Sequence, residues 1–321
     1  MHGVRQPGVL FSLLLVTLFT NARRTDSQAT VDLQNAKSYG LSVSVDEVLL
    51  TFHAADTHGL PINDLKLEEL SLVDNGKPPR KILSFQSVRD LPLRAGILID
   101  TSESMQQDLA GNQAISIKYL QRLVRQPTDL AFVMKFGPVA EIAQAWTGDS
   151  NALAAGIRRF TATSTSHLRG TALFNAVYQA CLNQFGHIDR AGSGNFILLF
   201  SDGEDNAGNT SLKNVIDQCQ HTNTAIYAFR TDTKVSFGSA GPKILADLAS
   251  QSGGRVFNAN ESDAEIDSDL RMIEANLRNQ YRLIYRPAEL AHDGSFHRIS
   301  LRAPERVDNI VIRSGYYAPF H

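Results

Sequence analysis

The sequence predicts an α/β fold, with a doubly wound, mostly parallel six-stranded sheet that carries helices on both faces. Three observations lead to this prediction. Apolar runs without alternation recur between residues 93 and 279, separated by helix-like segments, and such runs are typical of strands buried on both faces of a parallel sheet. Oxygen-bearing side chains follow directly after two of these runs. On either side of this region, alternation and turn signals indicate antiparallel β-structure.

Strands and helices alternate in the central region. The strands are expected at residues 94–100, 129–136, 140–146, 195–201, 224–230 and 255–258. The helices are expected at residues 105–125, 151–159, 171–185, 211–221, 242–251 and 263–279. The short Gly137-Pro138 turn between the second and third strands predicts a hairpin, and hence one antiparallel strand at a sheet edge. Right-handed helical crossovers between the remaining strands place helices on both faces.

The flanking segments, residues 39–92 and 280–321, are expected to form a β-rich unit. In the first, apolar and polar residues alternate between positions 41 and 52, and turn signals follow at 56–59 and 74–78. The second is expected to contain strands at residues 280–286, 296–301 and 309–313. Each flank alone is too small for a good core. This favours one joined β-sandwich into which the central domain, residues 93–279, is inserted, and two separate appendages are the alternative.

The first residues have the features of a secretory signal peptide, expected at 1–29 and followed by a linker at 30–38. Arg5 precedes an apolar segment at 9–20 that is too short to span a bilayer comfortably, and small residues at 27–29 suit cleavage. A buried helix or an uncleaved anchor is the alternative. No later apolar run is long enough to be transmembrane. We therefore expect a secreted or periplasmic protein with no transmembrane segment in the mature chain.

Composition and cysteine content restrict the class further. The net charge of the 321 residues is −2 and no basic patch is present, so a nucleic-acid partner is not expected. The two cysteines, Cys181 and Cys219, lie in predicted helices before and after the strand at 195–201. In an oxidising compartment they form a disulfide if those helices are neighbours, and otherwise they are two separate buried thiols. The sequence supports both alternatives.

Five oxygen-bearing side chains occur at or just after the expected strand ends and at the start of a helix. One strand ends in Asp100 and is followed by two serines, a later glycine-broken loop presents a threonine, and an Asp-Gly pair follows the strand at 195–201. In open α/β sheets ligands bind at the carboxyl ends of the strands. The candidate ligand residues are Asp100, Ser102, Ser104, Thr171 and Asp202.

This set resembles the metal-ion-dependent adhesion site of the von Willebrand factor type A family, written Asp-x-Ser-x-Ser, then Thr, then Asp in a strand-terminal Asp-Gly. All five positions match in type and order. The resemblance implies a protein-binding function, with Ser102 and Ser104 as direct ligands and the other three binding directly or through water. The flanks also resemble a group of secreted bacterial proteins, through a DGKP-like turn at 75–78 and a GYYAP-like end at 315–319.

The donor set favours Mg²⁺ or Mn²⁺ over Ca²⁺, because hydroxyls outnumber carboxylates. Two ionised aspartates neutralise such an ion without excess negative charge. The ion then stays electrophilic, and the expected partner is a protein that offers an Asp or Glu carboxylate. Three nearby acidic residues, Glu103, Glu204 and Asp205, are interpreted as rim charges and not as ligands.

Each candidate ligand also has a local alternative. Ser104 with Gln107 fits a helix capping box, Thr171 fits an N-cap, Asp202-Gly203 fits a turn, and Asp100 can simply end a strand. These separate roles do not explain why five oxygen donors occur in this order at one end of a sheet. The metal site is therefore the hypothesis carried forward.

Two other function classes are alternatives for this sequence. A hydrolase or phosphatase-like enzyme is not expected, because no G-x-S-x-G motif is present and Ser102 stands where such phosphatases carry a second acidic residue. A scaffold whose metal site is purely stabilising or degenerate is the main alternative. The expected function is secreted, metal-dependent protein binding, in adhesion or in assembly at the cell surface.

Overall fold

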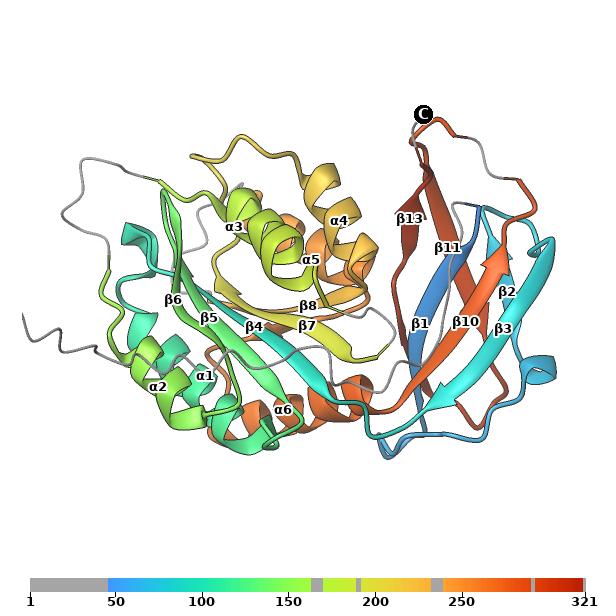
Figure 1. Cartoon of the computed structure of the whole chain (residues 1–321), viewed down its shortest axis with the longest axis horizontal. Coiled ribbons are helices and arrows are strands. Elements are labelled where there is room, and N and C mark those ends of the chain that lie inside the picture. The colour runs from blue at the N-terminus through green and yellow to red at the C-terminus, as the bar shows by residue number, and fades with distance from the viewer. Residues whose placement is uncertain (1–45, 163–169, 189–191, 232–238, 290–291, 320–321) are drawn as a thin grey trace, which may run out of the picture. The chain divides into compact units, whose positions relative to one another are not determined.

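Figure 1 shows a computed structural model of the chain, which describes residues 46–162, 170–188, 192–231, 239–289 and 292–319. The expected signal peptide and linker, residues 1–38, lie outside the described residues. No helix in the described part of the chain combines the length and apolar character needed to cross a membrane.

The central region folds into one six-stranded sheet with the order β6-β5-β4-β7-β8-β9. Its strands are β4 (Leu93–Asp100), β5 (Leu130–Phe136), β6 (Ala140–Thr147), β7 (Gly194–Ser201), β8 (Thr224–Arg230) and β9 (Val256–Asn258). All neighbours pair in parallel except β5 and β6, which form the antiparallel hairpin at the sheet edge. The predicted mostly parallel sheet and its single antiparallel edge are confirmed.

Helices cover both faces of this sheet, each over its own apolar core (Figure 1). One face carries α1 (Leu109–Leu123), α2 (Ser150–Arg158) and α6 (Asp263–Arg278), and the other carries α3 (Leu173–Gln179), α4 (Leu212–His221) and α5 (Gly241–Ser252). All eight residues of β4 are buried, because the strand lies between both layers. Its unbroken apolar run is explained by this double coverage.

Two helices differ from the sequence prediction. The helix expected from residue 105 begins only at Leu109, after a 3₁₀ turn, η3 (Glu103–Met105). Within this turn the Ser104 hydroxyl donates a hydrogen bond to Asp202. The helix expected at 171–185 begins at Leu173 and continues after Gln179 as a π-helical segment, η4 (Ala180–Phe185).

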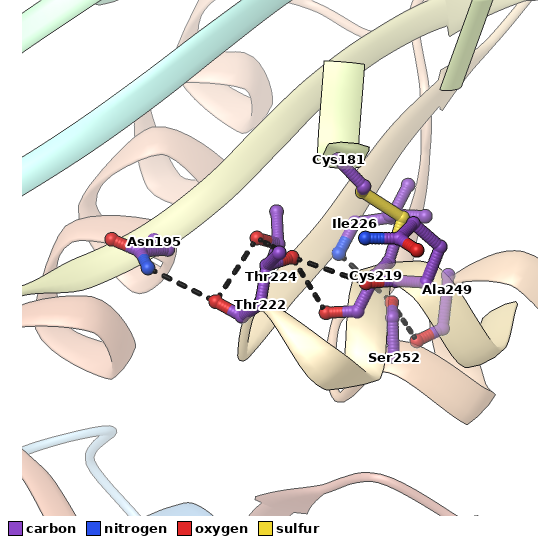
Figure 2. Close-up of a disulfide and its surroundings, with 9 residues drawn as sticks. Cys181, Asn195, Cys219, Thr222, Thr224, Ile226, Ala249 and Ser252 are labelled. Carbon is purple, nitrogen blue, oxygen red and sulfur yellow. Dashed lines mark hydrogen bonds between the residues drawn. A yellow bond between two sulfur atoms is a disulfide. The ribbon is translucent and has the colours of Figure 1, made fainter. Parts of the chain in front are cut away.

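A disulfide joins Cys181 of η4 to Cys219 of α4 (Figure 2). Both residues are fully buried, and their Cα atoms lie 5.1 Å apart. The helices α3 and α4 pack side by side on one face of the sheet, which is the neighbour relation that a disulfide requires. The structure therefore contains the bonded pair and not two separate thiols.

The two flanks contribute strands to shared antiparallel sheets. A four-stranded sheet with the order β12-β1-β10-β3 contains β1 (Val48–Ala55), β3 (Lys81–Val88), β10 (Gln280–Arg286) and β12 (Asn309–Ile312). A three-stranded sheet with the order β13-β11-β2 contains β2 (Ser71–Asp74), β11 (Phe296–Arg302) and β13 (Gly315–Tyr317). A 3₁₀ turn, η2 (Leu67–Glu69), precedes β2. The expected β-rich unit built from both flanks is confirmed, and we propose that it is one β-sandwich interrupted by the central domain.

A buried polar network links these two sheets. The carboxyl of Asp74 on β2 accepts hydrogen bonds from the hydroxyls of Tyr285 and Tyr316, at 2.7 and 2.8 Å. The Nδ1 atom of His297 lies 2.9 Å from the other carboxyl oxygen, and all four side chains are buried. Burial and the neighbouring Asp74 raise the pKa of both tyrosines, so their hydroxyls stay protonated and donate. One carboxyl group thus satisfies three buried polar groups.

We expect the substitution Asp74→Ala to lower the free energy of unfolding by about 3–5 kcal/mol, because it leaves buried polar groups without their partner. The control Tyr316→Phe removes only one hydroxyl, which donates to Asp74 and lies 3.3 Å from His297 Nδ1, and it should cost about 1–2 kcal/mol. Urea unfolding followed by circular dichroism measures both values. Equal losses in the two variants would show that Asp74 does not organise the network.

Candidate metal centre

The candidate site forms where the ends of β4 and β7 meet. These strands are parallel neighbours at the centre of the sheet, with Ile99 opposite Phe200. The next residues, Asp100 and Ser201, therefore end their strands at the same sheet edge. The chain leaves β4 toward β5 on one side, while β7 lies on the other side. This is the strand arrangement at which ligands bind in open α/β sheets.

Asp100 is the buried centre of the site. Its side chain is fully inaccessible to solvent. Its Oδ1 atom accepts a hydrogen bond from the backbone N–H of Ser102 at 2.9 Å, and its Oδ2 atom accepts one from the Ser201 hydroxyl at 2.9 Å. The Ser201 oxygen in turn accepts from the backbone N–H of Gly203 at 3.0 Å. The Asp100 carboxyl therefore connects the loop after β4 to the loop after β7.

The two serines and Asp202 are in contact through their side chains. The hydroxyl oxygens of Ser102 and Ser104 lie 3.2 Å apart, and the Ser104 hydroxyl donates to Asp202 Oδ2 at 2.7 Å. The other carboxylate oxygen of Asp202 accepts from the backbone N–H of Glu204 at 3.0 Å. Ser102 is buried, Asp202 is half-buried and Ser104 is exposed. The cluster thus runs from the buried Asp100 outward to solvent.

Thr171 joins this cluster through its backbone. Its N–H donates to Asn206 Oδ1 at 2.8 Å, and its carbonyl oxygen accepts from the N–H groups of Asn206 and Ala207, both at 3.0 Å. Thr171 is buried beside the loop that follows Asp202. The structure therefore brings the loops of all five candidate residues to one end of the sheet, and links four of them by hydrogen bonds that involve their side chains.

The local capping roles considered for Ser104 and Thr171 are not found. The N-cap position of α1 is Asp108, so Ser104 does not begin that helix. The N-cap position of α3 is Ala172, whose side chain cannot cap, so Thr171 does not fill that role either. The turn role of Asp202 is present, through its bond to Glu204, and it leaves the second carboxylate oxygen facing Ser104.

Several residues that shape the site have little signal in the sequence. Ser201 was assigned only to its strand, although its hydroxyl holds Asp100. Asp205, interpreted as a rim charge, accepts a hydrogen bond from the N–H of Phe174 at 3.0 Å in the first turn of α3. Gly203 adopts φ of 86°, and a Cβ atom there would lie 2.3 Å from the carbonyl oxygen of Gly241. The Asp-Gly pair is the only sequence signal for this close approach.

The electrostatics of the site favour a bound cation. Burial raises the pKa of Asp100, hydrogen bonds from Ser102 lower it in part, and the nearby charge of Asp202 raises it, which together give a pKa of about 7. Burial also raises the pKa of Asp205. A carboxylate that is costly to keep charged, beside a second carboxylate, is stabilised by either a proton or a metal ion. At neutral pH a cation is therefore a suitable occupant.

The five residues fit a hard divalent ion by their chemistry. All the side chains offer oxygen, and two of the five are carboxylates. Within the described ranges, no group of three or more His, Cys, Asp and Glu side chains is placed to hold a metal. The candidate site differs from such groups because three of its donors are hydroxyls. Asp100, Ser102, Ser104, Thr171 and Asp202 are the residues that would hold the ion.

The sequence matches the von Willebrand factor type A domain profile over residues 96–270. No curated protein matches the chain. Among solved structures, BatB from Bacteroides thetaiotaomicron is 13% identical, with a TM-score of 0.45 over 56% of this chain and 97% of that chain. A von Willebrand factor type A protein from Catenulispora acidiphila is 12% identical, with a TM-score of 0.43 over 80% of this chain and 75% of that chain.

Proximal thread matrix protein 1 from the mussel byssus is also similar. It is 14% identical, with a TM-score of 0.46 over 59% of this chain and 49% of that chain. The present chain thus spans about half the length of the mussel protein. Another structure of the mussel protein is described with a zinc-occupied MIDAS motif.

The raised pKa of Asp100 predicts how pH changes the stability of the metal-free protein. Between the ordinary value of 3.8 and the folded value of about 7, the folded state holds a proton that the unfolded state has released. The free energy of unfolding therefore falls as pH rises through this window. We expect Asp100→Asn to be more stable than wild type at pH 8, by at most about 4 kcal/mol, and by clearly less at pH 5.

Thermal unfolding in chelator at both pH values measures this difference. Glu103→Gln is the control, because it neutralises an exposed carboxylate in the same loop and should change stability little at either pH. A stability gain in Asp100→Asn that is the same at pH 5 and pH 8 would contradict the raised pKa of Asp100.

Proposed function

The chain belongs to the von Willebrand factor type A domain family, and we propose from this premise that it binds another protein through a divalent cation. The cation is held by Asp100, Ser102, Ser104, Thr171 and Asp202. The observation that carries the proposal is the contact of Ser104 with both Ser102 and Asp202, directly outside the buried Asp100.

The burial gradient across the site supports a role in recognition. Asp100, Ser102 and Thr171 are buried, whereas Ser104 is exposed and Asp202 is half-buried. An ion held by these residues would be accessible to a partner beside the exposed Ser104. When bound, it supplies an electrophilic centre that accepts a carboxylate oxygen from an Asp or Glu of the partner.

The donor set supports Mg²⁺ or Mn²⁺ as the ion. Ca²⁺ usually takes more oxygen ligands and more carboxylates than this site offers, whereas Mg²⁺ binds through one or two carboxylates and keeps several waters. With both aspartates ionised, the charge of the ion is balanced and not exceeded. Because the other three donors are neutral hydroxyls, the ion stays electrophilic, and this favours an anionic ligand from outside the chain.

Two features support a place outside the cytoplasm. The first residues of the sequence have the pattern of a signal peptide, with Arg5 before an apolar segment. The disulfide between Cys181 and Cys219 is of a kind that persists in oxidising compartments. We propose a secreted or periplasmic bacterial protein that acts in adhesion or in assembly at the cell surface.

A scaffold role is the second candidate, and one contact favours it. The hydrogen bond from Ser104 to Asp202 already ties the two loops together through the protein alone. In that case an ion only stabilises the loops, or the site is degenerate. Catalysis has less support than either, because the residue two positions after Asp100 is Ser102, which is a poor general acid.

We expect the mature protein, stripped with chelator, to bind about one Mg²⁺ or Mn²⁺ per chain in a calorimetric titration. The variant Asp100→Ala should lose this binding and remain folded, because it removes one of only two carboxylates in the donor set. Glu103→Gln, beside the site but outside the donor set, should bind as wild type does. Wild-type affinity for the metal ion in Asp100→Ala would show that Asp100 is not a ligand and that the site is wrongly assigned.

Water-proton relaxation of the Mn²⁺ complex distinguishes recognition from scaffolding. A recognition site keeps exchangeable waters on the ion, so we expect strong relaxation enhancement that falls when a peptide containing Asp or Glu is added. The same peptide with Asn and Gln in place of the acidic residues should have no effect. Weak enhancement that neither peptide changes would favour the scaffold.

A further inference from the structure

Thr171 is held at the site by the loop after Asp202, and Asn206 makes two of these contacts. The carboxamide oxygen of Asn206 accepts the Thr171 N–H at 2.8 Å, and the Asn206 N–H donates to the Thr171 carbonyl oxygen at 3.0 Å. Asn206, four positions after Asp202, therefore binds both backbone polar groups of Thr171, and the N–H of Ala207 donates to the same carbonyl oxygen at 3.0 Å. The position of Thr171 is therefore coupled to the position of the loop after Asp202.

Asp205 caps the first turn of α3, a role that a threonine just before a helix often fills. The first turn of a helix has backbone N–H groups that a nearby Ser, Thr, Asp or Asn usually satisfies. In α3 the N-cap position is Ala172, and Asp205 accepts the N–H of Phe174 from the opposite loop. Thr171 thus stands before the helix and is not its cap. Its hydroxyl is not required for capping, which suits it for a ligand role.

Two glycines leave room for the side chains that make these contacts. Gly170 adopts φ of 101°, and a Cβ atom there would lie 2.4 Å from the Asn206 carboxamide oxygen. A Cβ atom at Gly208 would lie 2.8 Å from a carboxylate oxygen of Asp205. Gly170 leaves room for the Asn206 carboxamide between the two segments, and Gly208 leaves room for the Asp205 carboxylate within its own loop. Asn206 and Asp205 then bond across to Thr171 and Phe174.

The same two segments are joined again at their far ends. The helix after Thr171 continues through α3 into η4, where Cys181 bonds to Cys219 of α4, the helix that follows Asp202 and its loop (Figure 2). Asn175 provides a further contact, since its carboxamide oxygen accepts the N–H groups of Asn209 and Thr210 at 3.2 and 3.1 Å. The segment of Thr171 and the segment of Asp202 therefore behave as one connected piece.

We propose that Asn206 is a positioning residue of the metal site. It holds Thr171 close to Asp202, so that both residues bind the same cation. The inference rests on the metal-binding function proposed above. Asn206 acts through Thr171 and does not itself contact the ion. Because the site has only two carboxylates, its affinity depends on the placement of its hydroxyl donors, and loss of this contact weakens metal binding more than it weakens the fold.

The test compares three variants by Mn²⁺ titration, with free Mn²⁺ followed by electron paramagnetic resonance, and by thermal unfolding. Asn206→Leu removes the acceptor for the Thr171 N–H, whereas Asn206→Asp keeps an acceptor oxygen at that position. Asn175→Leu is the matched control, because it removes a carboxamide that bonds two backbone N–H groups between the same segments but does not touch Thr171. Asn206 is exposed, so its replacement should not prevent folding.

We expect Asn206→Leu to weaken Mn²⁺ binding about 10-fold or more, as outer-shell substitutions commonly do. Asn206→Asp should restore wild-type affinity or exceed it, and Asn175→Leu should lower the unfolding temperature while affinity stays within about threefold of wild type. If Asn206→Leu does not fold, Asn206→Ala removes the same acceptor with less bulk and takes its place.

Three results would overturn the inference. Wild-type affinity in Asn206→Leu would show that Thr171 is positioned without Asn206, and failure of Asn206→Asp to restore binding would show that the acceptor oxygen is not what matters. An equal loss of affinity in Asn175→Leu would show a general effect of loosening the two segments. Absence of Mn²⁺ binding by the wild-type protein would instead overturn the proposed function, and the inference with it.

Discussion

The buried carboxyl of Asp100 is the constraint on which the candidate site depends. It ends β4 without any exposed surface, and it is held by the Ser102 N–H from its own loop and by the Ser201 hydroxyl from β7. Burial disfavours its charged form, and the charge of Asp202 adds to this. The fold thus buries a carboxyl group whose charged form a bound cation would stabilise. Any change in how β4 and β7 pair would move both loops.

A second buried carboxyl, that of Asp74, organises the flanks in a similar way. It brings together the turn after β2 and the end of the chain, because Tyr316 donates to it from β13. The turn itself needs Asn75 and Gly76 in left-handed conformations, with φ of 49° and 84°. A Cβ atom at Gly315 would lie 2.2 Å from the carbonyl oxygen of His297. The two flank motifs therefore pack together, although Asp74 and Tyr316 lie 242 positions apart in the sequence.

Local sequence rules failed where the partner of a group came from far along the chain. Ser104 and Thr171 each suited a helix cap, since caps are usually supplied by the residue just before the helix. In the structure α1 begins later, and Asp205 serves the first turn of α3 from 31 positions away along the sequence. Both residues are thereby left in contact with the loop that carries Asp202. The same long-range contact makes Asp205 part of the support of the site, and not only a charge at its rim.

The sequence by itself determined the buried strands, the antiparallel edge at Gly137-Pro138 and the order of five oxygen donors after the strand ends. These are local patterns of hydrophobicity and spacing, which a single chain segment expresses without its neighbours. Only the tertiary structure decided that β4 lies beside β7, that Asn206 binds Thr171 and that Cys181 meets Cys219. Each of these depends on the distance and orientation between segments far apart in the chain. The periodicity of apolar residues within one segment carries no information on its distance from another segment or on their relative orientation.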